Sequence, residues 1–167
     1  MIGERDGPKV WNLVQQWTPS GVYDHENKYQ SELQDYLDEQ LNSDPGGLGM
    51  GTGGNGSYTV TTERGTAYGD VVVNDTVGIE LKRNFSNDQK RKLRGQLEDY
   101  GDNYEFVIAC TCGIEDIDGW REIENKFSHQ RGLMDATGFR FIVKRRDEFG
   151  DGDHSGDDGF LGEGDLF

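Results

Sequence analysis

The sequence predicts an α/β protein built on a mixed β-sheet that is flanked by helices. Three strand-like segments, rich in β-branched and aromatic residues, follow one another over residues 58–63, 68–73 and 77–83. From residue 86 onward, segments with helical periodicity alternate with apolar, strand-like ones. A strand that crosses over through a helix to a parallel strand places helices on the faces of the sheet. The expected order is therefore α-β-β-β-α-β-α-β, in one domain of 167 residues.

Two helices are expected before the first strand. A short one covers residues 10–17, after Pro8, because its apolar residues recur at helical spacing: Val10, Leu13, Val14 and Trp17. An amphipathic helix follows over about 24–41. The glycine-rich segment 44–56 comes next, and it is either a mobile flap over a site or a plain linker to the first strand.

A capping-box pattern at Ser86 and Gln89 opens the helix that follows the three strands, and Gly101 is expected to end it after Tyr100. The remaining expected elements are a buried strand at 104–111, a helix at about 115–130 and an alternating strand at 139–146. We divide the chain into a docking helix (1–22), a main domain (23–146) and an acidic tail (147–167) that stays disordered until something binds it.

The hairpin between the second and third strands carries a geometric prediction. If residues 74–76 form a three-residue turn, Val73 faces Val77 across the ladder. Counting back, Asp70 then lies opposite Glu80, so that the two carboxylates share one face of the sheet. A two-residue turn would send Asp70 to the other face.

Lys82 joins this face, because residues two apart on a strand point the same way. The opposite face is the expected core: Val71, Val73, Val77, Ile79 and Leu81. Two carboxylates beside a lysine at a sheet edge repel one another unless a cation neutralises them. Carboxylate oxygens suit Mg²⁺ or Mn²⁺, so the pattern predicts metal-dependent phosphodiester hydrolysis in which Lys82 orients water or steadies developing charge.

Asp70 is followed by nine residues and then by Glu80-Leu81-Lys82. This spacing resembles the motif of the PD-(D/E)xK nuclease superfamily, with Gly69 where the motif has proline. Gln96 and Tyr100 resemble the QxxxY element of its RecB-like branch, and their i, i+4 spacing puts both on one helix face. The resemblance implies a restriction-endonuclease-like fold and a DNA substrate. It also implies an acidic residue on the first helix near the metal, for which we choose Glu32 ahead of Glu26, Asp35 or Glu39.

A basic cluster lies between positions 82 and 94 of an otherwise acidic chain: Lys82, Arg83, Lys90, Arg91, Lys92 and Arg94. It is interpreted either as a surface for backbone phosphates beside the site, or as a solvated helix face.

The formal net charge is −15, and eight of the carboxylates lie in residues 147–167. Acidity spread over the whole chain resembles that of proteins from salt-loving archaea or their viruses, although acidic surfaces also occur elsewhere. The resemblance implies a high-salt cytoplasm or the inside of a virus particle as the expected location. High salt shortens the Debye length to about 3 Å at 1 M, so an acidic surface would repel DNA little there. No apolar stretch is long enough to span a membrane.

Other chemistry is less well supported by the residues. His25, His129 and His154 have no metal-ligand spacing, which argues against zinc. Cys110 and Cys112 share one face of a strand and are expected to be reduced core residues.

The sequence therefore predicts a Mg²⁺- or Mn²⁺-dependent deoxyribonuclease, acting as an endo- or exonuclease. The alternative is a catalytically silent protein of the same fold, such as a virus-particle connector. A regulator that binds DNA without cutting it would share the basic cluster but not the carboxylate pair. A protein partner at the N-terminal helix or the acidic tail, and a homo-oligomer, are left open.

Overall fold

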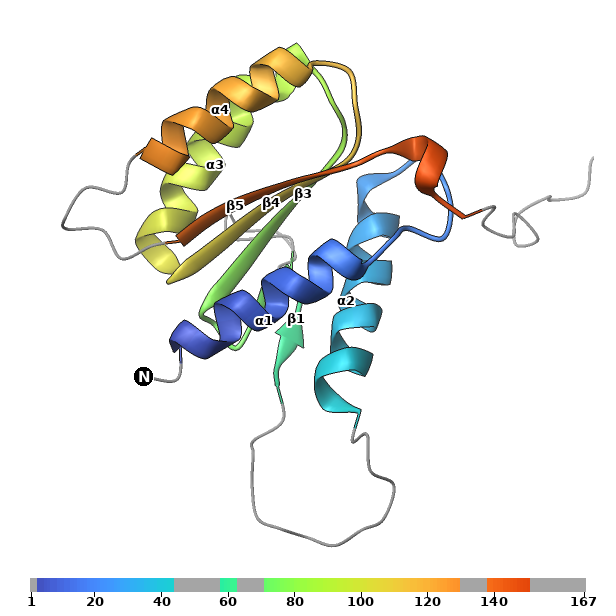
Figure 1. Cartoon of the computed structure of the whole chain (residues 1–167), viewed down its shortest axis with the longest axis vertical. Helices are drawn as coiled ribbons and strands as arrows, with labels where there is room; N and C mark the ends of the chain where they lie inside the picture. Colours follow the sequence, from blue (N-terminus) through green and yellow to red (C-terminus); the bar gives the residue numbers. More distant parts are fainter. Residues whose placement is uncertain (1–2, 44–57, 63–70, 130–137, 151–167) are drawn as a thin grey trace, which may run out of the picture.

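The computed structural model describes residues 3–43, 58–62, 71–129 and 138–150 (Figure 1). The glycine-rich segment 44–56, the residue Asp70 and the tail from 151 lie outside these residues, so the predictions made for them have no structural description.

The chain forms one five-stranded mixed sheet with strand order β1-β2-β3-β4-β5. The strands β1, β2 and β3 are antiparallel neighbours, whereas β3, β4 and β5 run parallel through two helical crossovers. This topology confirms the predicted α/β class with a mixed sheet. The strand bounds are Val60–Thr61, Val71–Val73, Val77–Phe85, Phe106–Ile114 and Gly138–Lys144.

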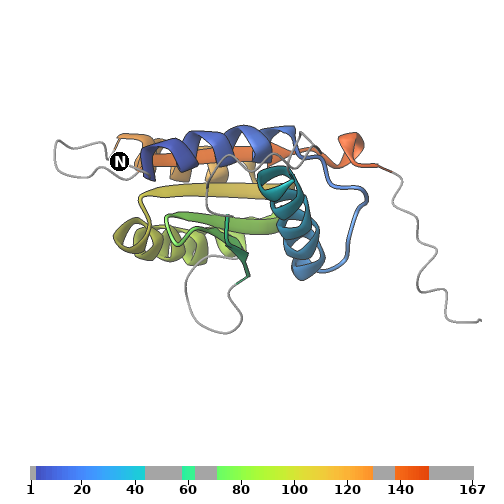
Figure 2. The ribbon, with the colours of Figure 1, turned by 90° about the horizontal axis from the view of Figure 1, so that it is seen from below.

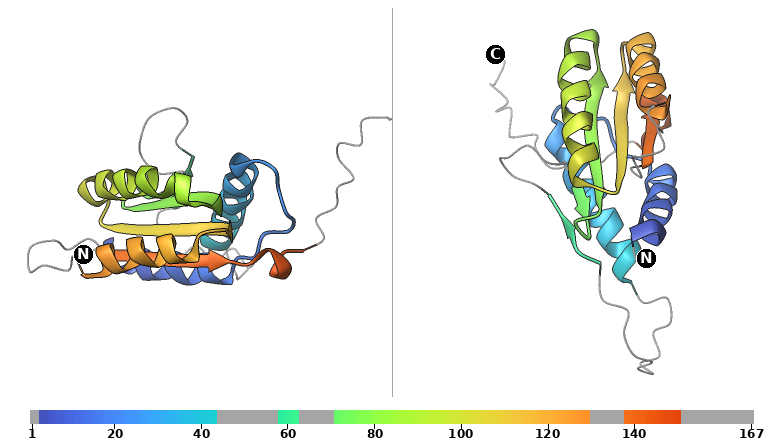
Figure 3. Two further views of the ribbon diagram at one scale, coloured as in Figure 1. Left: turned by 90° about the horizontal axis from the view of Figure 1, so that it is seen from above. Right: turned by 90° about the vertical axis from the view of Figure 1, so that its left-hand side faces the viewer.

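Helices cover both faces of the sheet, as the crossovers require (Figures 2 and 3). The pair α1 (Gly3–Gln16) and α2 (Glu26–Asn42) lies on one face, and the pair α3 (Lys90–Asn103) and α4 (Ile117–His129) lies on the other. β3 contributes Val77, Ile79 and Leu81 to the core on the side of α1 and α2. It contributes Phe85, which follows Asn84 at a φ of 53°, to the core on the side of α3 and α4. No helix within the described ranges is long and apolar enough to cross a membrane.

The first helix begins earlier than predicted and belongs to the core. It starts at Gly3, with Pro8 inside it. A β-carbon at Gly7 would lie 2.5 Å from the Phe106 ring, so the glycine lets α1 approach β4 closely. Val10 and Val14 are fully buried against the sheet. The predicted docking helix therefore packs on its own domain, and tertiary contact outweighs the local preference of proline for a helix start.

The third helix runs past the glycine that was expected to end it. Gly101 lies within α3, which continues to Asn103, and the backbone N–H of Tyr104 donates to the Tyr100 carbonyl. A β-carbon at Gly101 would lie 2.9 Å from Cζ of Phe139. The glycine thus makes room for β5 instead of forming a C-cap.

The fold continues beyond the predicted start of the tail at residue 147. A short 3₁₀ helix, η2 (Arg146–Glu148), follows β5. Phe149 is buried, and its ring packs edge-on to Tyr29 of α2 at a centroid distance of 6.1 Å. The boundary between domain and tail therefore lies after residue 149.

Candidate active site

The hairpin between β2 and β3 has the predicted three-residue connection. Asn74 and Asp75 adopt left-handed φ angles of 52° and 56°, which these residue types tolerate best after glycine. The ladder pairs are Val73 with Val77, Val72 with Gly78 and Val71 with Ile79. Asp70, the next residue back along β2, lies outside the described residues, so the structure does not test its placement opposite Glu80.

Both faces of β3 are buried, which differs from the predicted site at a sheet edge. β3 is the middle strand of five. Ile79 and Leu81 face α1 and α2, whereas Glu80 and Lys82 face α3 and α4 with exposed fractions of 1% and 4%. The candidate residues therefore lie beneath a helical layer rather than on an open surface.

Glu80 is the centre of a hydrogen-bonded cluster. Nζ of Lys82 donates to Oε1 of Glu80 at 2.6 Å, and the Tyr100 hydroxyl donates to Oε2. Tyr100 comes from α3 and is 2% exposed. Both carboxylate oxygens are thus engaged by groups that stabilise a negative charge inside the protein.

Gln96 lies one helical turn before Tyr100 and carries an unsatisfied oxygen. Its Oε1 is buried, and it accepts no hydrogen bond from any residue that the structure describes. An unsatisfied buried polar atom costs about 1–3 kcal/mol, and such atoms often have a ligand or a catalytic role. Glu80, Lys82, Tyr100 and Gln96 are the predicted site residues that β3 and α3 supply to this side of the sheet.

Glu32 belongs to a different network. Its Oε1 accepts from the backbone N–H of Ser20 at 2.8 Å and from the Trp17 indole at 3.3 Å. Its Oε2 accepts from the Ser20 hydroxyl at 2.8 Å and from the Tyr23 hydroxyl at 2.6 Å. Because α2 packs on the face opposite Glu80, the structure does not bring Glu32 to the Glu80 cluster.

The alternatives to Glu32 on the same helix lie in other surroundings. Oε2 of Glu26 accepts from the backbone N–H of Arg83 at 3.1 Å. Asp35 and Glu39 line a surface cavity of about 310 Å³ together with Glu32.

The predicted basic cluster divides into three environments. Lys82 points inward, and Nε of Arg83 donates to the Tyr23 carbonyl at 2.8 Å on the other side of the sheet. The rest lie on α3, where Lys92 is exposed. Lys90, which is paired with Glu122 of α4, lines an open cavity of about 580 Å³ with two exposed residues, Arg91 and Arg94. Only part of the cluster therefore forms one surface.

The sequence analysis missed a second basic surface at the carboxyl ends of the parallel strands. A cavity of about 710 Å³ there is lined by Arg121 of α4 and by the two arginines that follow β5, Arg145 and Arg146. The available signal was topological, because ligand sites in α/β proteins gather where parallel strands end. Arg145 and Arg146 are the last two residues of the predicted strand 139–146, and they come directly after the observed end of β5 at Lys144.

Lys144 is a buried cation that the sequence did not distinguish. Its Nζ donates to the Gln15 carbonyl at the end of α1 at 2.8 Å, and burial lowers its pKa. Cys110 and Cys112 are buried and free, as predicted, and their contact together with burial raises the pKa of Cys112.

The donor chemistry of the Glu80 cluster suits a hard divalent cation. Glu80 and Gln96 offer oxygen atoms, which Mg²⁺ and Mn²⁺ prefer, and no sulfur or imidazole ligand. Among the described residues, no group of three or more His, Cys, Asp or Glu side chains lies close enough to hold a metal ion. Asp70, the other predicted metal ligand, lies outside the described residues.

Comparison with known proteins adds no relative: no protein-family model matches the chain, and no curated protein or solved structure does so either.

Proposed function

We propose that this chain is a metal-dependent deoxyribonuclease of the PD-(D/E)xK type, hydrolysing phosphodiester bonds. The observation that carries the proposal is the Glu80 cluster, in which the acid and lysine of one strand meet the tyrosine of the next helix inside the protein. The unsatisfied oxygen of Gln96, on the same helix, supports it. These are the residues that the acid-x-Lys and QxxxY patterns predict to act together.

Asp70 and Glu80 would hold the cation, and it would supply Lewis-acid polarisation of the scissile phosphate. Nζ of Lys82 contacts Glu80, and it would donate a hydrogen bond to the attacking water or to the charge that develops on the phosphate. Tyr100 fixes the orientation of the Glu80 carboxylate. Gln96 is a positioning residue for the substrate strand.

The DNA backbone would lie along α3, where Lys90, Arg91 and Arg94 line an open cavity. These cations share a helix with Gln96 and Tyr100, so one element links the backbone contact to the Glu80 cluster. Phosphate contacts of this kind position DNA without reading its sequence.

A second candidate function is a catalytically silent protein of this fold, which binds a partner. The observation in its favour is that both Glu80 oxygens are already engaged and that Glu80 and Lys82 are almost fully buried. A buried ion pair of this kind can be purely structural.

Cleavage assays separate the two functions. The purified chain is incubated in high salt with single-stranded, linear duplex and branched DNA, with Mg²⁺, with Mn²⁺ or with a chelator. We expect metal-dependent cutting that Lys82→Met and the double variant Glu80→Gln/Lys82→Met both abolish. The double variant removes both charges of the ion pair, so neither charge is left buried without its partner and the fold should be kept. Removal of only one partner of a buried ion pair lowers the free energy of unfolding by about 3–5 kcal/mol.

The matched control removes one carboxylate and one lysine from exposed positions outside the open cavity beside α3. Glu105→Gln/Lys28→Met makes the same two changes in side-chain type and should leave cutting unchanged. Absence of cutting by the folded wild-type chain on all three substrates would support the silent protein instead.

A further inference from the structure

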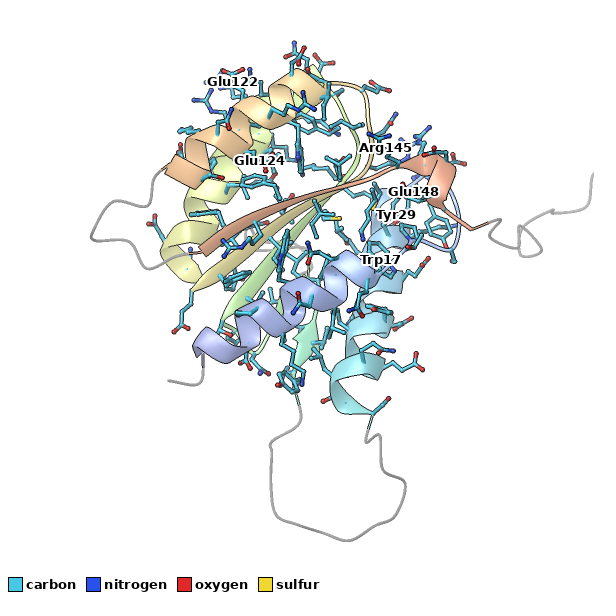
Figure 4. The ribbon with its side chains drawn as sticks, viewed as in Figure 1. Trp17, Tyr29, Glu122, Glu124, Arg145 and Glu148 are labelled. Carbon is cyan, nitrogen blue, oxygen red and sulfur yellow. The ribbon has the colours of Figure 1, made fainter. Side chains whose placement is uncertain are left out.

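A groove lies beside β5, and Figure 3 shows the ribbons of α4 and α1 next to this strand. The groove consists of two cavities, of about 710 Å³ and 350 Å³, which share the side chain of Glu124. The larger lies at the carboxyl end of β5, and the smaller includes Trp11 of α1. We call these two cavities the edge groove; Figure 4 labels Glu124 and Arg145.

The edge groove combines cations with apolar surface. Arg121, Arg145 and Arg146 are exposed, and none of them belongs to the ion pairs found among the described residues. Ile117 contributes to the larger cavity and is 38% exposed, one of two large hydrophobic residues so exposed in the described part of the chain. Half-buried Phe139 and Phe141 line the smaller cavity. A phosphate alone would use the arginines and leave the apolar surface uncovered.

The groove also borders a strand edge. β5 is the last strand of the sheet and pairs only with β4 among the residues that the structure describes. An extended segment can add to such an edge through main-chain hydrogen bonds, while pockets beside the strand accept its side chains. The groove therefore suits an extended, acidic segment with large apolar side chains.

Residues 151–167 of this chain have that composition. They contain six carboxylates, no lysine or arginine, and four large apolar residues: Phe160, Leu161, Leu166 and Phe167. The described chain reaches Gly150, three residues after Asp147, which itself lines the larger cavity. At about 3.3 Å per residue, these 17 residues suffice for a turn and a strand beside the seven residues of β5.

We propose that residues 151–167 dock in the edge groove of their own chain, as a strand added to β5. Their carboxylates neutralise Arg121, Arg145 and Arg146, and their aromatic side chains cover the apolar surface beside Ile117 and the β5 phenylalanines. The proposal is independent of the nuclease function, since it uses none of the residues of the Glu80 cluster.

Hydrogen exchange of the full chain, followed by mass spectrometry at two protein concentrations, tests the docking. We expect the amides of residues 160–167 to exchange slower than in an unstructured peptide by about an order of magnitude or more. The triple variant Arg121→Glu/Arg145→Glu/Arg146→Glu should raise their exchange to the unstructured rate. The matched triple variant Lys28→Glu/Arg91→Glu/Lys92→Glu makes the same charge change on other exposed surfaces and should preserve the protection.

A second variant changes the segment instead of the groove, so it cannot fail by unfolding the sheet. Phe160→Ser/Phe167→Ser should also remove the protection, with unchanged exchange in β3 and β4. Unstructured exchange rates in the wild-type chain would overturn the proposal. Protection that appears only at the higher concentration would overturn docking in the same chain and assign the groove to a second copy. If the segment exchanges freely while the groove variant loses affinity for an oligonucleotide, the groove serves nucleic acid.

Discussion

Glu32 shows how the surroundings of one carboxylate decide its role. Four hydrogen bonds tie it to the segment between α1 and α2, on the side of the sheet away from Glu80. We therefore expect Glu32→Ala to lower the free energy of unfolding by about 1–3 kcal/mol, because it removes the acceptor of the part-buried Trp17 and Tyr23 side chains.

The same variant should cut DNA as fast as the wild type at a temperature where both are folded. Urea denaturation and single-turnover cleavage measure the two effects. If the Glu32→Ala protein is as stable as the wild type but does not cut DNA, the original prediction that Glu32 is an acidic residue near the metal would be supported instead.

Tyr29 should lower the free energy of unfolding at alkaline pH. Burial raises its pKa above the ordinary value of 10.0. The folded protein then keeps the phenol proton at pH values where the unfolded chain has begun to release it, so stability falls as the pH rises above 10.

The variant Tyr29→Phe should weaken this fall, measured by urea denaturation at neutral and alkaline pH. Its stability at neutral pH should drop, because the Tyr23 N–H loses the hydroxyl it donates to at 2.9 Å. An identical pH dependence in the two proteins would show that Tyr29 is not the group responsible.

At the scale of elements, α3 offers two glycines with opposite expected effects. Gly95 has open space around its missing β-carbon, so Gly95→Ala should stabilise the protein by roughly 0.5–1 kcal/mol through helix propensity. Gly101→Ala should destabilise it by about 1 kcal/mol, because the new methyl group displaces the Phe139 ring. Thermal unfolding of the two variants measures the difference, and equal shifts would contradict the close approach of α3 to β5.

Elements were predictable from the sequence where the signal is local. The hairpin depends on turn residues and on an alternating pattern, and its three-residue connection was confirmed. The start of α1 and the end of α3 were not predictable. Pro8 is a local start signal and Gly101 is a local stop signal, and close contacts with β4 and β5 outweigh them.

The site was predictable in the same limited way. The pairing of Glu80 with Lys82 follows from their spacing on one strand. Their burial was not predicted, because it results from α3 and α4 closing over the sheet. The arginines of the edge groove were not predicted as one surface, because Arg121 of α4 and the pair Arg145 and Arg146 after β5 come together only in the folded protein.

At the scale of the whole molecule, the net charge of −15 should make stability depend on salt. Carboxylates repel one another in the folded state, and added ions screen that repulsion. We expect the urea concentration at the midpoint of unfolding to be higher in molar KCl than in low KCl. The slope of the free energy of unfolding against urea concentration should be unchanged. A midpoint that falls with KCl would contradict an acidic surface adapted to high salt.

The most direct test of the central claim is Mn²⁺ binding to chelator-treated protein in molar KCl, measured from the electron paramagnetic resonance signal of the free ion. The account predicts one specific site in the wild-type chain. It should be lost in Glu80→Gln/Lys82→Met and retained in Glu32→Gln and in Glu105→Gln/Lys28→Met. No specific Mn²⁺ site in the folded wild-type protein, or a site that survives the Glu80 change, would contradict the assignment of the Glu80 cluster as a metal-dependent active site.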